Sequence, residues 1–108
     1  MMGFDQYTYR VSWSEEDQKH VASCAEFPSL IWLDTTPEKA LAGVRKVVVQ
    51  CVEDMKESGE AIPEPLSVKS FSGRFMVRVP PQLHRQLATL AAESGVSLNR
   101  LISHKLSQ

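Results

Sequence analysis

The sequence predicts an α+β fold: an N-terminal antiparallel β-meander packed on one helix, followed by a C-terminal strand and two short helices. Three observations lead to this prediction. Apolar residues alternate with polar ones along residues 7–13, they recur at spacings of three and four along residues 41–55, and the charge changes sign near Lys69. A chain of 108 residues can build one modest core and a small second module that folds by pairing.

Three strand-like segments occupy the first third of the chain. The alternation along residues 7–13 gives the first strand one apolar face, and the polar run 14–19 is typical of a turn. Residues 21–25 and 30–33 are the second and third apolar segments. A three-stranded meander is the simplest arrangement of these segments.

A helix is expected from Pro37 to about Glu57. Thr36 can cap its first amides, and proline fits the first helical position. Gly59 can end the helix in the left-handed conformation. Residues 66–70 are either a last strand or a connector. The apolar face of the helix contains Leu41, Val44, Val47, Val48, Cys51, Val52 and Met55.

The charge pattern divides the chain into two parts, residues 1–70 and residues 71–108. The first part carries seven basic and twelve acidic side chains, a net charge of −5, and the second carries five basic and one acidic, a net charge of +4. A basic tail on an acidic body indicates an anionic partner, with nucleic acid the leading candidate. A solvated basic surface without a partner is the alternative.

Residues 75–79 alternate like a strand and are followed by Pro80-Pro81, a pair that ends a strand and can begin a helix. The first helix should close at Gly95, and Ser97 can cap the second. These elements cannot bury their apolar faces alone, and a single strand leaves an unpaired edge. We therefore expect a two-fold dimer in which two strands pair and four helices share a core.

This pattern resembles the ribbon-helix-helix family of Arc and MetJ over residues 73–107. The resemblance rests on the run Arg74–Pro81, the following amphipathic helix, Gly95 and the run Val96–Ile102. It implies that the ribbon of the dimer lies in the major groove of double-stranded operator DNA. Carried over by position, the DNA-binding residues are Arg74, Met76, Arg78, Ser97, Leu98 and Asn99.

The chemistry of these side chains agrees with such a role. The forked donors of Arg74 and Arg78 match the O6 and N7 acceptors of guanine. Met76 offers only apolar contact, so discrimination at that position should be weak. The free amides and the dipole at the start of the second helix, near Ser97, favour a phosphate. The alternative is a dimerisation arm with incidental arginines, which salt dependence would distinguish.

The segments Trp13–Asp17, Val21–Leu30 and Thr36–Leu41 resemble the N-terminal domain of HicB antitoxins over residues 7–62. The resemblance implies a partial, truncated RNase H-like sheet and helix that binds and blocks HicA, a small toxin that cleaves messenger RNA. A C-terminal ribbon-helix-helix is one of that family's usual arrangements. Residues 1–70 are then a toxin-binding domain, and residues 71–108 a DNA-binding and dimerisation domain.

No residue pattern indicates an enzyme. The acidic residues are scattered or lie in the turn Glu15–Asp17, and the three histidines match no metal-ligand spacing. Cys24 and Cys51 are expected to be reduced packing residues. We therefore expect no catalytic residues, no metal and no cofactor. Since no apolar run is long enough to span a membrane, a cytoplasmic protein is expected.

The leading hypothesis is an antitoxin that neutralises a HicA-like toxin and represses its own operon as a homodimer or higher homo-oligomer. The alternative is a stand-alone ribbon-helix-helix regulator whose N-terminal domain binds a ligand or supports oligomerisation. A purely structural dimer conflicts with the placement of Arg74 and Arg78. An acidic domain suits a basic toxin. Because either Ile31 or Trp32 should face outward, Trp32 is a candidate interface anchor, although a core position is favoured.

Overall fold

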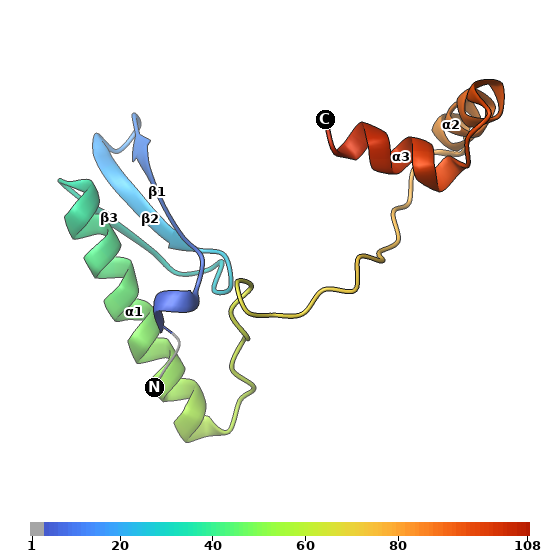
Figure 1. Cartoon of the computed structure of the whole chain (residues 1–108). Helices are drawn as coiled ribbons and strands as arrows, with labels where there is room; N and C mark the ends of the chain where they lie inside the picture. Colours follow the sequence, from blue (N-terminus) through green and yellow to red (C-terminus); the bar gives the residue numbers. More distant parts are fainter. Residues whose placement is uncertain (1–3) are drawn as a thin grey trace. The chain divides into compact units, whose positions relative to one another are not determined.

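The structure is a computed structural model that describes residues 4–108. The chain forms two compact units, one that ends at Phe71 and one from Ser72 to Gln108, here called the N-terminal and C-terminal units (Figure 1). A three-stranded antiparallel sheet and three α-helices give the α+β class that the sequence predicts. The boundary lies one residue after the predicted one, and the roles of the two parts remain predictions.

The N-terminal unit begins with a short 3-10 helix followed by the meander. The elements are η1 (Phe4–Gln6), β1 (Tyr9–Ser14), β2 (Lys19–Cys24) and β3 (Ile31–Asp34). The strands pair antiparallel in the order β1-β2-β3, so the predicted meander is confirmed. The β1–β2 turn is closed by Ser14, whose Oγ donates to the carboxylate of Asp17 at 2.9 Å. Gln18, the last residue of this turn, has a φ of 52°.

The register of the sheet separates its two faces. Val11 lies opposite Ala22, and Ala22 lies opposite Trp32, so the three share one face. Figure 1 shows α1 (Pro37–Ser58) against one face of the sheet. Ala22 packs with Val44 of α1, which identifies this face as the covered one.

The ends of α1 are set by local sequence, as predicted. Thr36 is extended and its Oγ1 accepts from the amide of Lys39 at 3.1 Å, while Gly59 ends the helix with a φ of 77°. Val48 and Val52 are fully buried. The β-branched run around them is helical because burial outweighs its weak helix propensity.

The core of the N-terminal unit forms where α1 meets β2 and the loop after it. Cys24, Val48 and Val52 pack with Phe27 and Tyr7, whose rings meet edge to face at 5.2 Å. Burial raises the pKa of the Tyr7 hydroxyl. Both cysteines are free thiols, Cys24 buried and Cys51 half-buried, which agrees with packing roles.

The segment after α1 is irregular and remains attached to the N-terminal unit. The Tyr7 hydroxyl donates to the carbonyl of Pro63 at 2.8 Å, and Ser67 Oγ donates to the carbonyl of Gln6 at 2.6 Å. The amide of Lys69 donates to the carbonyl of Pro65 at 3.0 Å in a turn. Of the two options for residues 66–70, the connector is therefore correct.

The C-terminal unit consists of two helices after an extended segment. The helices are α2 (Pro81–Ser94) and α3 (Leu98–Leu106), and both confirm the prediction. Gly95, with a φ of 70°, closes α2, and its N–H donates to the carbonyl of Ala92 at 3.2 Å. Of the helices described over residues 4–108, none has both the length and the apolar composition needed to cross a membrane.

Candidate functional site

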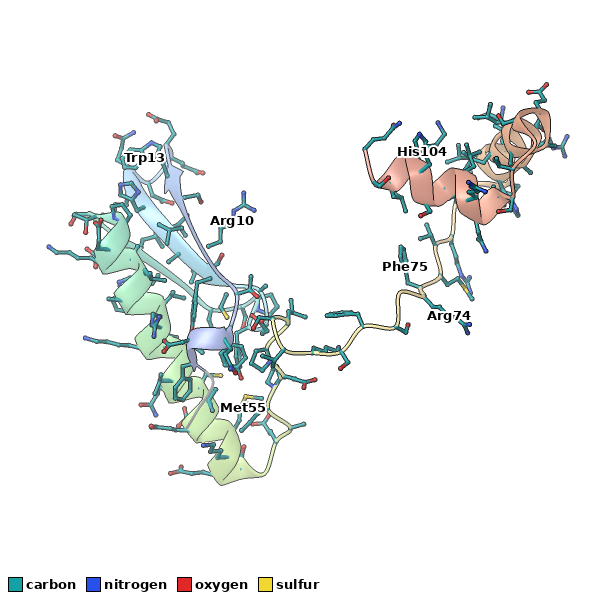
Figure 2. All side chains as sticks on the ribbon, viewed as in Figure 1. Arg10, Trp13, Met55, Arg74, Phe75 and His104 are labelled. Atoms are coloured by element: carbon teal, nitrogen blue, oxygen red, sulfur yellow. The ribbon has the colours of Figure 1, made fainter. Side chains whose placement is uncertain are left out.

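The segment between Gly73 and Pro80 carries the three side chains predicted to reach base edges. Arg74, Met76 and Arg78 alternate with Phe75, Val77 and Val79. In Figure 2 the labelled side chains of Arg74 and Phe75 leave the chain on different sides. These two neighbouring residues are therefore oriented as successive residues of a strand would be.

No paired strand forms over residues 75–79 of the single chain, which differs from the predicted strand. The physical reason is that a strand needs a hydrogen-bonding neighbour, and the described C-terminal unit contains only helices besides this segment. Its apolar side chains are exposed, with Phe75 at 76% and Val77 at 63%. A second copy of the chain is predicted to supply the missing partner strand.

The helices leave most of their apolar surface uncovered. Ala91 is the single buried hydrophobic residue described in the C-terminal unit, while Leu83 and Leu90 are each 40% exposed and Leu106 is 67% exposed. Fully burying a leucine side chain contributes about 1.5–3 kcal/mol, so covering the exposed part of each of these side chains would contribute roughly half of that amount. A unit of this size with so little buried surface is typical of one half of a shared core.

The start of α3 has the geometry expected of an anion-binding helix end. Ser97 is extended, and its Oγ accepts from the amide of Arg100 at 3.1 Å. The amides of Leu98 and Asn99 belong to the first turn, which has no carbonyl partners within the helix. The dipole adds partial positive charge there. A phosphate contact at this helix end remains a prediction.

Charge in the C-terminal unit is available for binding. Among the described residues, neither Arg74 nor Arg78 forms an ion pair. Glu93 is the one acidic residue between positions 71 and 108. Both arginines lie in the exposed extended segment, so their guanidinium groups are free to reach an anionic partner.

Trp32 is partly exposed, which differs from the core position that the sequence favours. Its indole packs on Gly43 of α1, where an added Cβ would lie 2.2 Å from ring atoms, yet Trp32 remains 40% exposed. Ile31 is 53% exposed. Because β3 is the edge strand and one helix covers the sheet, the helix reaches only part of the ring. Trp32 is thus a packed residue that is still available as an interface anchor.

Acidic residues of the N-terminal unit do not converge on a metal position. Among residues 4–108, no group of three or more histidine, cysteine, aspartate or glutamate side chains is arranged to hold a metal ion. An ion pair joins Arg45 to Asp5, beside the Tyr9 ring.

Glu26 links distant segments of the N-terminal unit, a role that its sequence context does not indicate. Its Oε1 accepts from the Thr8 amide at 2.9 Å, and its Oε2 accepts from Thr8 Oγ1 at 3.1 Å and the Leu66 amide at 2.9 Å. Desolvation raises the pKa of Glu26, but the hydrogen bonds from Leu66 and Thr8 outweigh it and lower the pKa to about 2. Since its partners are 18 and 40 positions away, no local pattern signals this role.

The chain combines an acidic sheet-and-helix unit with a basic two-helix unit. Residues 56–106 match the model of the HicB family, a range that includes the end of α1 and all of α2 and α3. Neither the curated proteins nor the solved structures contain a match to the chain. The match supports a relationship to HicB proteins, and it overlaps the segment that resembles the HicB N-terminal domain only at residues 56–62.

Proposed function

We propose that the chain is a HicB-family antitoxin of a toxin–antitoxin pair. In this proposal residues 1–70 bind and neutralise a HicA-like toxin that cleaves messenger RNA, and residues 71–108 bind operator DNA and repress the operon. The observation that carries the proposal is the family match over residues 56–106. An antitoxin role is what membership of that family implies.

The C-terminal unit is proposed to act as a ribbon-helix-helix dimer. Two copies of residues 74–79 would pair as an antiparallel ribbon, which places Phe75, Val77 and Val79 on a core shared by four helices. The exposure of these side chains in the single chain supports the pairing. The outward residues Arg74 and Arg78 would then contact bases in the major groove.

The N-terminal unit is proposed to be the toxin-binding part, with a truncated RNase H-like arrangement of sheet and helix. Residues 1–70 have a net charge of −5. A toxin that cleaves RNA needs a basic surface around its active site, so the two charges are complementary. This complementarity favours rapid association as well as selectivity.

DNA binding is tested by fluorescence anisotropy on a labelled duplex from the promoter upstream of the gene. Arg78→Ala should weaken binding by about 1–3 kcal/mol if Arg78 reads a base. Arg85→Ala is the matched control, because it removes the same charge from α2. Equal losses for both variants would contradict base reading by Arg78. Wild-type affinity should also fall steeply with added salt.

Neutralisation is tested by expressing the small protein encoded beside the gene, with and without the full chain, and following growth. Growth arrest relieved by a chain that carries Arg74→Ala and Arg78→Ala would establish neutralisation independent of repression. An absence of toxicity, or toxicity that the chain does not relieve, would refute the antitoxin role.

The alternative of a stand-alone regulator is favoured by one observation. An open groove of about 540 Å³ runs along α1 and is lined by Glu38, Leu41, Ala42, Arg45, Lys46, Val49 and Gln50. Its apolar floor, with Arg45 and Lys46 against the single carboxylate of Glu38, would suit a small amphipathic anion. Promoter binding that changes with such a ligand, in a gene with no toxic neighbour, would favour this function.

A further inference from the structure

Two exposed tryptophans lie on the helix-facing side of the sheet. Trp13 is 49% exposed and Trp32 is 40% exposed. Figure 2 shows Trp13 at the end of the sheet where β1 and β2 are joined. The register places Trp13, His20 and Asp34 in one cross-strand row, and Trp32 lies two residues before Asp34 on the same face. These residues and Glu15 are here called the tryptophan patch.

Each indole holds a carboxylate beside it. Trp13 Nε1 donates to Oε1 of Glu15 at 2.9 Å, and Trp32 Nε1 donates to Oδ2 of Asp34 at 3.2 Å. The His20 ring meets Trp13 edge to face at 5.0 Å, which limits the orientations of that indole. The patch therefore combines flat aromatic surface with positioned negative charge.

Both carboxylates remain ionised near neutral pH. The hydrogen bond from Trp13 lowers the pKa of Glu15, with a further contribution from Gln18. The Thr35 amide, followed by the Trp32 indole, lowers the pKa of Asp34. Lys39 lowers the pKa of Asp34 further, and Glu16 and Asp17 adjoin Glu15 in the β1–β2 turn.

We infer that the tryptophan patch binds an arginine side chain presented by a basic protein partner. A guanidinium group stacks on an indole face while its forked N–H groups donate to carboxylates, and a lysine ammonium lacks this planar match. Exposed indole beside fixed carboxylate fits that group better than it fits an apolar segment. The inference deepens the proposed function, on which it rests for the identity of the partner as the toxin.

The test titrates the full chain with an arginine hexapeptide and a lysine hexapeptide, with tryptophan fluorescence as the readout. We expect the arginine peptide to bind more tightly. Trp13→Ala should weaken it about 2- to 5-fold, the effect of an exposed cation–π contact. The double variant Glu15→Gln/Asp34→Asn should weaken it by a similar factor or more.

Two matched controls make the test specific. Glu53→Gln/Glu57→Gln removes the same charge from exposed positions of α1, and Ile31→Ala removes an exposed apolar side chain from β3. Both should change the affinity less than 2-fold, roughly the size of a screened surface effect. Equal losses for the two charge variants, or no loss with Trp13→Ala, would overturn the inference. The peptide assay needs no toxin, so it can fail separately from the proposed function.

One further variant tests whether the chain occupies its own patch. Arg74→Ala/Arg78→Ala should leave the peptide affinity unchanged, because the inferred occupant belongs to a partner. Tighter peptide binding by this variant would mean that the chain's own arginines compete for the patch, and would overturn the assignment to a partner. Circular dichroism of every variant checks that α1 is retained.

Discussion

Replacing Glu26 with glutamine should destabilise the N-terminal unit and release the segment that follows α1. The carboxylate accepts from Thr8 through both oxygens and from the Leu66 amide through Oε2. Glutamine has one acceptor oxygen, and its NH₂ group would face an N–H donor at one of the two positions. Glu26→Gln therefore leaves at least one amide without its acceptor.

The magnitude follows from the pKa of Glu26. A depression from 4.5 to about 2 sets an upper bound of about 3 kcal/mol on the differential stabilisation of the charged form. Glu26 is half-buried, and solvent screening reduces the expected loss to about 1–2 kcal/mol. The pKa of Glu26 is lower in the folded state than in the unfolded state. This stabilisation is therefore fully present above a pH of about 4.5 and is lost as the pH falls toward 2.

The assay is urea unfolding of the full chain, followed by tryptophan fluorescence at pH 7 and at pH 2.5. Trp13 and Trp32 both belong to the N-terminal unit, so the signal reports its unfolding. The free energy of unfolding of the wild type should exceed that of Glu26→Gln by about 1–2 kcal/mol at pH 7, and this difference should be smaller at pH 2.5. Glu16→Gln, in the exposed β1–β2 turn, is the matched control.

The pH dependence is the decisive part of this experiment. A difference of the same size at both pH values would refute the reasoning, because it would mean that side-chain shape rather than ionisation stabilises the unit. A loss below about 0.5 kcal/mol at pH 7 would mean that the hydrogen bonds to the Glu26 carboxylate are replaced by water at little cost.

Three further changes test the packing and the caps. Gly43→Ala should lower the free energy of unfolding in urea by about 1–3 kcal/mol, because the alanine Cβ would meet the Trp32 ring. This loss should exceed the gain that alanine gives a helix over glycine. A gain in stability would contradict this packing. Val48→Ala should cost about 2–3 kcal/mol, measured in the same way, because Val48 is fully buried; a change below about 1 kcal/mol would show that the site collapses around the gap. Ser97→Ala should lower the stability of α3 by about 1 kcal/mol in thermal melts followed by circular dichroism, while an unchanged melt would exclude a contribution from the cap.

The elements that the sequence predicts well are those set by local chemistry. Thr36-Pro37 and Gly59 fix the ends of α1 through backbone requirements of a few residues. The alternation along β1 and the stop at Gly95 are local signals of the same kind. These signals place the helices within a residue or two of the structure.

Contacts between distant segments were missed because they have no local pattern. The connector over residues 66–70 contains apolar residues that suit a strand, but its hydrogen bonds go to Glu26 and Gln6 rather than to a strand edge. The sequence favours a core position for Trp32, whereas in the structure a single helix covers only part of its ring. The pairing predicted for residues 75–79 is intermolecular, so a single chain does not display it.

The hydrogen bonds to Leu66 and Ser67 also determine how much chain tethers the two units. In the proposed dimer, where residues 74–79 form the ribbon, a connector attached as far as Lys69 leaves residues 70–73 as the link, whereas a released connector would leave residues 60–73. A flexible link of about 4 residues has a root-mean-square reach of about 11 Å, and one of about 14 residues reaches about 21 Å. Since local concentration falls roughly as the −3/2 power of length, attachment raises the concentration of one unit near the other about 6-fold. A single carboxylate at Glu26 thus helps set the effective concentration for any bivalent complex that the chain forms.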